Sequence, residues 1–195
     1  MLIGIDMDDV LGDFVGGLVE YHNETYGTSF KKDDFSSFDF WKVWGGDKES
    51  AVKKVCDFYE TPYFKNLKPI EGSIEAVDEL SKHHELMIIT SRPEYIKKET
   101  LEWVERYFPD KFKEVYFAKN SYMNPTTGKE KLELCLEKNV DVLVEDALQH
   151  IYKYTHNGRT KVFLYDSPWN RNKTLPSNVK RVKSWNEIVK LIKIM

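Results

Sequence analysis

Several short, almost uninterrupted apolar runs are spread along the chain, and they constrain its fold more than any other feature. They lie at residues 2–5, 86–89, 142–144 and 162–164, with 115–117 as a weaker candidate. Strands that are covered on both faces form such continuous runs, whereas strands exposed on one face alternate apolar and polar residues. The runs therefore predict buried strands in a sheet that carries helices on both sides.

Helical patterns separate these runs from residue 70 onward. We expect helices at 74–82, 93–107, 129–138 and 147–154, and a last helix that ends near residue 193. Ser184 and Glu187 have the spacing of a capping box, which would start this last helix. Regular alternation of strand and helix is typical of a parallel sheet. The predicted fold class is therefore α/β, with a Rossmann-like parallel sheet as its core.

Residues 14–69 interrupt this alternation. Helical patterns occur at 14–26 and 48–59, and no apolar strand run appears in the segment. We therefore expect a helical cap inserted after the first strand. In this division the α/β core consists of residues 1–13 and 70–195, and the cap of residues 14–69. A chain of 195 residues is long enough for one domain with a small insertion.

Composition limits the partners and the location that can be expected. The net charge of −3 gives no electrostatic reason to expect binding to duplex nucleic acid or to an anionic membrane. No signal-peptide pattern and no apolar run of membrane-spanning length occurs. Cys56 and Cys135 form no CxxC motif, so we expect free thiols in a reducing compartment. The predicted location is cytoplasmic, and the oligomeric state stays open, with a homodimer as one option.

Polar residues follow three of the predicted strands directly. They are Asp6, Asp8 and Asp9 after the first run, Thr90, Ser91 and Arg92 after the second, and Glu145 and Asp146 after the run at 142–144. In an open parallel sheet, ligands bind outside the carboxyl ends of the strands. Carboxylates bind Mg²⁺, whereas hydroxyl groups and cations bind phosphoryl oxygens. The sequence therefore predicts a Mg²⁺ site beside a site for a phosphate monoester.

These motifs resemble those of the haloacid dehalogenase superfamily of phosphatases. The segment Asp-Met-Asp-Asp-Val-Leu-Gly-Asp-Phe at 6–14 is similar to the first motif of that superfamily and, more narrowly, to that of its 5′(3′)-deoxyribonucleotidase branch. Thr90 matches the second motif, Lys131 the third, and the acidic pair at 145–146 the fourth, in the order of the family. The resemblance covers about residues 1–150 and includes a helical cap between the first two motifs.

The resemblance implies a role for each matching residue. Asp6 would be the nucleophile that forms an aspartyl-phosphate, and it would also bind Mg²⁺. Asp8 would act as general acid and base, and its backbone carbonyl would bind the metal. Asp146 would complete the protein ligands of Mg²⁺. The predicted substrate-binding residues of the phosphate site are Thr90, Ser91, Arg92 and Lys131.

Three positions depart from the usual pattern or leave alternatives open. Asp9 stands where glycine is common, which places an additional carboxylate beside the metal. Glu145 replaces the more usual first Asp of the acidic pair, and its extra methylene could move it out of direct contact with the metal. Lys129 competes with Lys131 as the phosphate-binding lysine. We favour Lys131, because its distance in sequence from Glu145 suits a helix, a loop and a strand.

Five aromatic residues are concentrated in the predicted cap, at 35, 38, 40, 41 and 44. Such residues could simply form the core of the cap. Aromatic faces also stack on nucleobases, and cap aromatics do so in the nucleotidases that the sequence resembles. We therefore favour Phe38, Phe40 and Trp41 as a platform for a base.

The predicted function is Mg²⁺-dependent hydrolysis of a phosphate monoester, with (deoxy)nucleoside monophosphates as the favoured substrates. Two alternatives stay open. The same core could act on sugar phosphates or another small metabolite, or the protein could bind nucleotides without turning them over. The sequence specifies neither the base, nor the sugar, nor the position of the phosphate.

Overall fold

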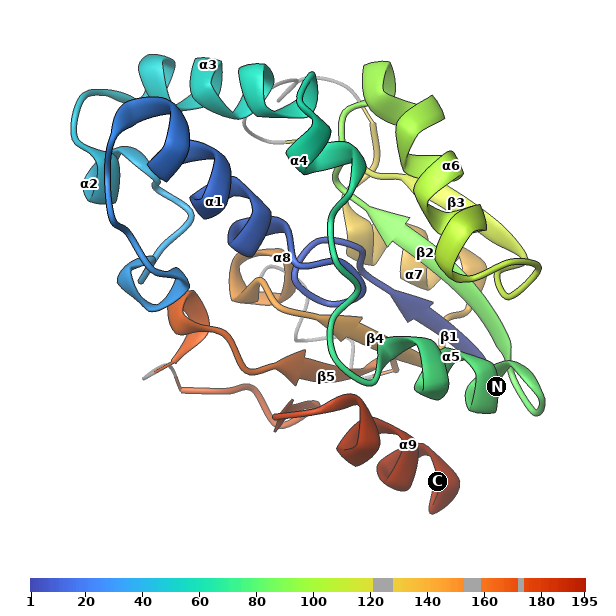
Figure 1. Ribbon diagram of the computed structural model, residues 1–195. Helices are drawn as coiled ribbons and strands as arrows, with labels where there is room; N and C mark the ends of the chain where they lie inside the picture. The colour runs from blue at the N-terminus through green and yellow to red at the C-terminus, as the bar shows by residue number, and fades with distance from the viewer. Residues whose placement is uncertain (121–127, 153–158, 172–173) are drawn as a thin grey trace.

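The computed structural model describes residues 1–120, 128–152, 159–171 and 174–195 (Figure 1). Within these residues, a six-stranded parallel sheet forms the centre, with the strand order β3-β2-β1-β4-β5-β6. The strands are β1 (Leu2–Ile5), β2 (Glu85–Thr90), β3 (Glu114–Phe117), β4 (Val142–Glu145), β5 (Lys161–Tyr165) and β6 (Val179–Val182). The predicted α/β fold class is confirmed.

Successive residues of the central strands face opposite sides of the sheet. In β2, Leu86 and Ile88 belong to one buried apolar cluster, whereas Met87 and Ile89 belong to another. All four side chains are buried. Because both faces are covered, the strand appears in the sequence as a continuous apolar run.

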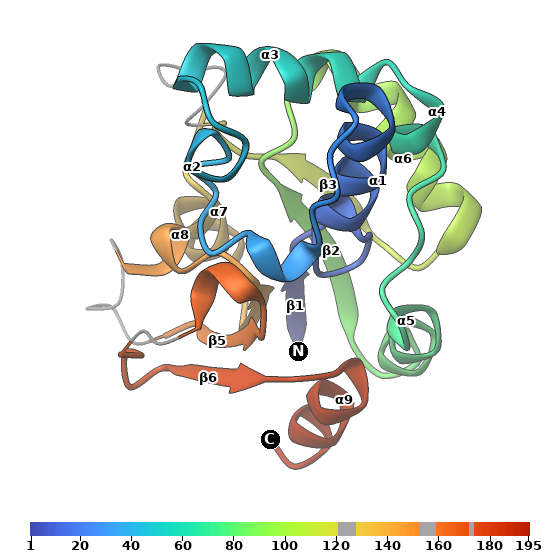
Figure 2. The ribbon, with the colours of Figure 1, turned by 60° about the vertical axis from the view of Figure 1, so that its left-hand side comes forward.

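Helices cover both faces of the sheet (Figure 2). On one face lie α5 (Ser73–Ser81), α6 (Lys97–Tyr107) and α9 (Trp185–Lys193), and on the other lie α7 (Lys131–Lys138) and α8 (Leu148–Tyr152). Trp185, the first residue of α9, is fully buried, and its indole N–H donates to the carbonyl of Val10 at 2.9 Å. This contact fixes the C-terminal helix against the loop that follows β1.

The segment between β1 and α5 is helical and lies beyond the carboxyl ends of the strands (Figures 1 and 2). It contains α1 (Phe14–Tyr26), the 3-10 turn η1 (Lys32–Asp34), α2 (Trp41–Trp44), α3 (Lys48–Tyr59) and α4 (Pro62–Lys65). Its apolar side chains, such as Leu18 and Phe58, belong to the same buried cluster as Ile3 in β1. The backbone N–H of Asp13 donates to the carbonyl of Lys68 at 2.9 Å, so the two ends of the segment lie side by side.

Several boundaries differ from the sequence-based expectation. No apolar run in the sequence indicates β6. Lys180 at its centre is exposed and Arg181 is half-buried, so the strand has no continuous apolar run. Helix α7 begins at Lys131 instead of residue 129, and part of the helix expected at 147–154 lies outside the described residues. Ser184 caps α9 as expected, but the carboxylate of Glu187 accepts the N–H of Lys183, which replaces the second bond of a capping box.

Two expectations from composition concern the cysteines and membrane-spanning segments. Cys56 and Cys135 are both free thiols, as predicted. Over the parts of the chain that the structure describes, no helix has the length and apolar character that crossing a membrane requires.

Candidate active site

The candidate site lies where the strand order of the sheet reverses. β1 and β4 are neighbours, and the chain proceeds from them toward opposite edges of the sheet. Such a switch point is the usual ligand-binding position of an open parallel sheet. Asp6 directly follows β1, Glu145 ends β4, and Asp146 comes next. The backbone N–H of Asp6 donates to the carbonyl of Val144 at 2.9 Å, which ties the two strand ends together.

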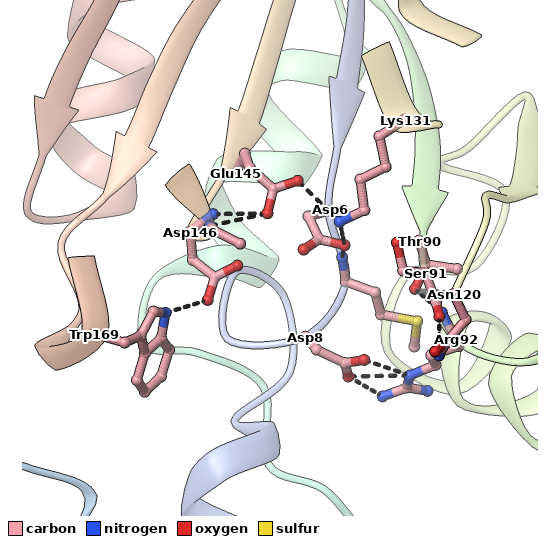
Figure 3. A network of polar contacts seen from close by, with 12 residues as sticks. Asp6, Asp8, Thr90, Ser91, Arg92, Asn120, Lys131, Glu145, Asp146 and Trp169 are labelled. Atoms are coloured by element: carbon pink, nitrogen blue, oxygen red, sulfur yellow. Dashed lines mark hydrogen bonds and ion pairs between the residues drawn. The ribbon is translucent and has the colours of Figure 1, made fainter. Parts of the chain in front are cut away.

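Asp6, Glu145 and Asp146 form a buried acidic cluster (Figure 3). One carboxylate oxygen from each residue lies within 4.8 Å of those from the other two. The three residues are 5%, 0% and 2% exposed. Carboxylate oxygens on strand ends are the hard donors that Mg²⁺ prefers. The predicted metal ligands Asp6 and Asp146 therefore lie together, and Glu145 lies with them.

Lys131 is the cation that contacts this acidic cluster within the described residues. Its Nζ lies 2.6 Å from Oδ1 of Asp6 and 2.8 Å from Oε2 of Glu145. The lysine side chain is buried, because it is the first residue of α7 and this helix packs against the sheet. The competing Lys129 instead pairs with Glu137 on the surface. The structure therefore places Lys131 in the site and Lys129 outside it.

The electrostatics of the acidic cluster favour the binding of a cation. Burial raises the pKa of Asp6 well above its ordinary value, and the charge on Glu145 raises it further, although Lys131 acts in the opposite direction. Burial also raises the pKa of Asp146, with Glu145 and then Asp6 adding to the effect. Three buried carboxylates repel one another, and Lys131 compensates only part of this charge. The residues present therefore fit a divalent cation such as Mg²⁺.

Trp169 and Asn170 hold Asp146 in position. The indole N–H of Trp169 donates to Oδ2 of Asp146 at 2.8 Å, and the side-chain amide of Asn170 donates to the Asp146 carbonyl at 2.7 Å. Both residues belong to η4 (Pro168–Asn170), a 3-10 turn that follows β5. Their position after the predicted strand at 162–164 places them near the expected mouth of the site, and this is the sequence signal that points to them.

The side chain of Asp8 points away from the acidic cluster and toward Arg92 (Figure 3). Nε of Arg92 lies 3.0 Å and 3.1 Å from the two carboxylate oxygens of Asp8, and Nη2 lies 2.6 Å from Oδ1. Arg92, predicted as a substrate-binding residue, thus forms a bidentate ion pair with the predicted general acid and base.

Thr90 and Ser91 lie at the end of β2, on the same edge of the sheet. Thr90 is fully buried, and its hydroxyl accepts the backbone N–H of Arg92 at 3.1 Å. The hydroxyl of Ser91 is buried and has no hydrogen-bond partner within the described residues, and Ser91 lines a cavity. An unsatisfied buried hydroxyl is unfavourable, so a ligand oxygen placed there would be stabilised. Asn120 donates to the Ser91 carbonyl at 2.8 Å and holds this segment.

Asp9, the additional carboxylate of the first motif, faces the helical segment. Its φ of 58° lies in the left-handed region. The carboxylate accepts the backbone N–H of Val15 near the start of α1 at 3.2 Å and contacts Nζ of Lys32 at 2.7 Å. Burial raises the pKa of Asp9 to about 7, although Lys32 opposes the shift. Asp9 therefore stabilises the start of α1 and connects it to η1.

A cavity of about 150 Å³ extends from the acidic cluster into the helical segment. Asp6, Asp8 and Lys131 line its polar end, whereas side chains from α1, α2 and α3 supply an apolar wall. The three predicted platform residues, Phe38, Phe40 and Trp41, all line this cavity. The pocket thus combines a charged end with an aromatic wall.

The three platform residues have different surroundings. The ring of Phe38 lies 5.1 Å from that of Trp169. Phe40 is buried, and its ring lies 5.1 Å from that of Trp44 and 5.7 Å from that of Phe35. Trp41 is half-buried and makes no aromatic ring contact in the described part of the chain. Of the three, Trp41 therefore has the ring face most available to a ligand.

Two solved structures share the fold of this chain. A predicted phosphatase from Clostridium acetobutylicum has a TM-score of 0.70 at 14% identity, with 100% of this chain and 98% of that chain covered. The HAD-hydrolase YfnB from Bacillus subtilis, bound to magnesium, has a TM-score of 0.61 at 12% identity, with coverages of 98% and 97%. The chain has the fold of haloacid dehalogenase-type hydrolases.

Sequence comparisons place the chain within this class. The family described as 5′ nucleotidase, deoxy (pyrimidine), cytosolic type C matches residues 1–195. The 5′(3′)-deoxyribonucleotidase of Bacillus subtilis (strain 168) is 30% identical over 194 residues, which cover 96% of this chain and 95% of the relative. The chain belongs to this nucleotidase family and is a phosphatase of phosphoric monoesters, which confirms the predicted family and enzyme class.

Proposed function

We propose that this protein hydrolyses nucleoside monophosphates in a Mg²⁺-dependent reaction that passes through an aspartyl-phosphate on Asp6. The observation that carries the proposal is the cavity with two unlike ends. One end holds Asp6, Lys131 and Asp146, and the other is walled by aromatic and aliphatic side chains. This polarity matches a phosphate joined to a nucleoside. The relative named a 5′(3′)-deoxyribonucleotidase supports the same substrate class.

In the first step, a carboxylate oxygen of Asp6 attacks phosphorus, and the bond from phosphorus to the nucleoside oxygen breaks. Asp8 gives its carboxyl proton to the leaving oxygen, so the nucleoside departs as a neutral alcohol. Lys131 and the hydroxyls of Thr90 and Ser91 bind the phosphoryl oxygens. The positive charge of Lys131 stabilises the charge on the group in transfer.

In the second step, a water molecule attacks the phosphorus of the aspartyl-phosphate. The carboxylate of Asp8 accepts the proton of this water. The bond from phosphorus to the Asp6 oxygen breaks, which releases inorganic phosphate and restores the Asp6 carboxylate. Asp8 ends the cycle protonated, as it began.

The carboxylates of Asp6 and Asp146 and the backbone carbonyl of Asp8 would hold Mg²⁺. Bound there, Mg²⁺ supplies charge neutralisation for the phosphoryl group. Glu145 would act from further out, because it accepts the backbone N–H groups of Asp146 and Ala147 at 3.2 Å and 3.0 Å and contacts Lys131. This assignment of Glu145 agrees with its longer side chain.

We further propose that residues 14–69 act as a cap over the core of residues 1–13 and 70–195. The adjacent ends of the segment, at Asp13 and Lys68, support a hinge at this position. Opening would admit the substrate, and closing would exclude water that is not part of the reaction. The cap would supply Phe38, Phe40 and Trp41 as the wall against which the base packs.

The test measures inorganic phosphate released from nucleoside 5′- and 3′-monophosphates and from sugar phosphates, with Mg²⁺ and with EDTA. The variants are Asp6→Asn and, as a control, Asp33→Asn, whose carboxylate is exposed and pairs with Arg171. We expect release from nucleotides with Mg²⁺, loss in Asp6→Asn, and normal release in Asp33→Asn. Release from sugar phosphates alone, nucleotide binding without release, or activity in EDTA would each contradict the proposal.

A further inference from the structure

The guanidinium of Arg92 is almost fully buried and already pairs with side chains of the protein. Its side chain is 1% exposed, whereas that of its partner Asp8 is 26% exposed. Three of its nitrogen atoms already donate to protein oxygens: Nε and Nη2 to Asp8, and Nη1 to the hydroxyl of Thr100 on α6 at 3.3 Å. The guanidinium also stacks on the ring of Phe64 from α4, at 4.7 Å. The guanidinium therefore has a protein partner at each of its three nitrogens and on one of its faces.

The bidentate geometry determines where the Asp8 carboxylate can lie. A planar guanidinium that donates to both oxygens fixes the plane of a carboxylate as well as its position. The bond to Thr100 and the stack on Phe64 prevent the guanidinium from turning with it. The backbone N–H of Arg92 is fixed too, because it donates to the hydroxyl of Thr90.

Asp8 lies only two residues from the proposed metal ligand Asp6, so its carboxylate has a competing position beside the cation. Without a second partner, the Asp8 side chain would be attracted to the cation, and it would then be unable to exchange protons with the leaving oxygen. Arg92 offers a positive charge on the opposite side, and the Asp8 side chain does point that way (Figure 3). The ion pair therefore opposes this competing position.

We propose that Arg92 is a positioning residue for Asp8, and that it acts on catalysis through that carboxylate without binding the phosphate itself. The inference rests on the proposed role of Asp8 as general acid and base. Because Phe64 belongs to the inserted helical segment, the position of Asp8 also depends on how α4 packs against the core. A change in Arg92 should therefore alter turnover more than binding.

The experiment compares Arg92→Gln and Arg92→Lys with Arg106→Gln as the matched control. Arg106 is an exposed arginine of α6 that donates to the Lys65 carbonyl at 3.3 Å, and it does not touch Asp8. Circular dichroism and thermal unfolding identify a variant that fails to fold. Arg92→Lys keeps the charge with fewer donors, so it tests the proposal even where Arg92→Gln is unstable.

The expected result is a separation of turnover from binding. In Arg92→Gln, kcat for a nucleoside monophosphate should fall by roughly 100-fold, the range of general acid–base catalysis, while KM and the inhibition constant of inorganic phosphate stay within about threefold. Arg92→Lys should show a smaller loss in kcat, and Arg106→Gln none. In an Asp8→Asn background, Arg92→Gln should cause little further loss, since the residue through which it acts is already disabled.

A second readout does not depend on activity. The Nε–H of Arg92 should give a protected signal in ¹⁵N NMR spectra, and Asp8→Asn should shift it or remove its protection. An unchanged signal would refute the ion pair in solution.

A rise of tenfold or more in KM or in the phosphate inhibition constant, with kcat unchanged, would show that Arg92 binds substrate and would overturn its assignment. Multiplicative losses in the Asp8→Asn background would also overturn it. Full activity of Asp8→Asn alone would instead refute the proposed role of Asp8 and both proposals together.

Discussion

The indole N–H of Trp169 donates to Oδ2 of Asp146 at 2.8 Å, so a residue from the turn after β5 orients a carboxylate at the end of β4. Partners of this kind fix the orientation of metal ligands, and their loss costs metal affinity. We therefore expect Trp169→Phe to weaken Mg²⁺ binding by roughly 10- to 100-fold, as isothermal titration calorimetry would measure.

Trp103→Phe is the matched control for this change. The indole N–H of Trp103 is also buried, but it donates a hydrogen bond to the carbonyl of Leu67 at 2.8 Å. This variant should lose about 1 kcal/mol of stability and keep its Mg²⁺ affinity. Equal affinities in both variants and the wild type would refute the orienting role of Trp169.

Lys131 should be required for activity, and Lys129 should not. Lys131→Met removes the positive charge that lies 2.6 Å from Asp6. Loss of one such charge-stabilising group typically costs roughly 10²–10³ in kcat. Lys129→Met breaks only a surface pair with Glu137 and should keep kcat within about twofold, because such pairs contribute little. Phosphate release at saturating substrate measures kcat for both variants. Equal losses of kcat in the two variants would contradict the assignment of Lys131 to the site.

Metal-free protein should be strained by the repulsion among Asp6, Glu145 and Asp146. Mg²⁺ should therefore raise the Tm of the wild type. Asp146→Asn removes one buried like charge, so we expect it to be more stable than the wild type in EDTA, by roughly 1 kcal/mol or about 2–4 °C, and to respond little to Mg²⁺. Differential scanning calorimetry checks this.

The control for Asp146→Asn is Asp78→Asn. Asp78 is an exposed carboxylate that pairs with Lys111 and Lys82. The Asp78→Asn variant should keep the full rise in Tm with Mg²⁺, and it should be no more stable than the wild type in EDTA. An Asp146→Asn protein that is less stable than the wild type in EDTA would show that the cluster is not strained.

Trp41 should contribute to the binding of the base. Its half-buried ring lines the cavity without stacking on another aromatic ring in the described residues. Stacking on a base contributes roughly 1–3 kcal/mol, so Trp41→Ala should raise KM for a nucleoside monophosphate by about 5- to 150-fold. KM for a small phosphate ester without a base should be unaffected. A parallel rise for both substrates would argue for a structural role.

His22 should make the stability of the protein depend on pH. Burial lowers the pKa of His22 to about 4, and the neighbouring Lys54 adds to this effect. Nε2 faces Nζ of Lys54 at 3.1 Å, so it accepts a hydrogen bond and the ring is neutral. Well above pH 6.5 neither the folded nor the unfolded state binds this proton. As the pH falls from about 6.5 to about 4, the unfolded chain binds it and the folded protein loses stability.

Urea unfolding across this range measures the effect, with His22→Gln as the comparison. Glutamine can retain a hydrogen bond to Lys54, but it does not titrate. The wild type should show the steeper decline, by at most about 1.4 kcal/mol per pH unit. Identical slopes in the two proteins would refute the assignment to His22.

Much of the fold could be predicted from local sequence. Burial on both faces makes β2 and β4 continuous apolar runs, and a crossover that is usually helical connects parallel strands that lie side by side. β6 could not be predicted in this way, because an edge strand with Lys180 and Arg181 at its centre has no continuous apolar run. The platform residues share one cavity, but whether they stack on a base stays a prediction.

The sequence by itself determined which residue types stand at the strand ends, since Asp6, Thr90 and Asp146 each follow or end an apolar run. The tertiary structure decided how these residues are paired. Arg92 lies 84 residues from Asp8 and Trp169 lies 23 residues from Asp146, yet both pairs are in contact. Periodicity and side-chain chemistry are local properties of a chain, whereas a partner depends on which loops the strand order brings to the same edge of the sheet.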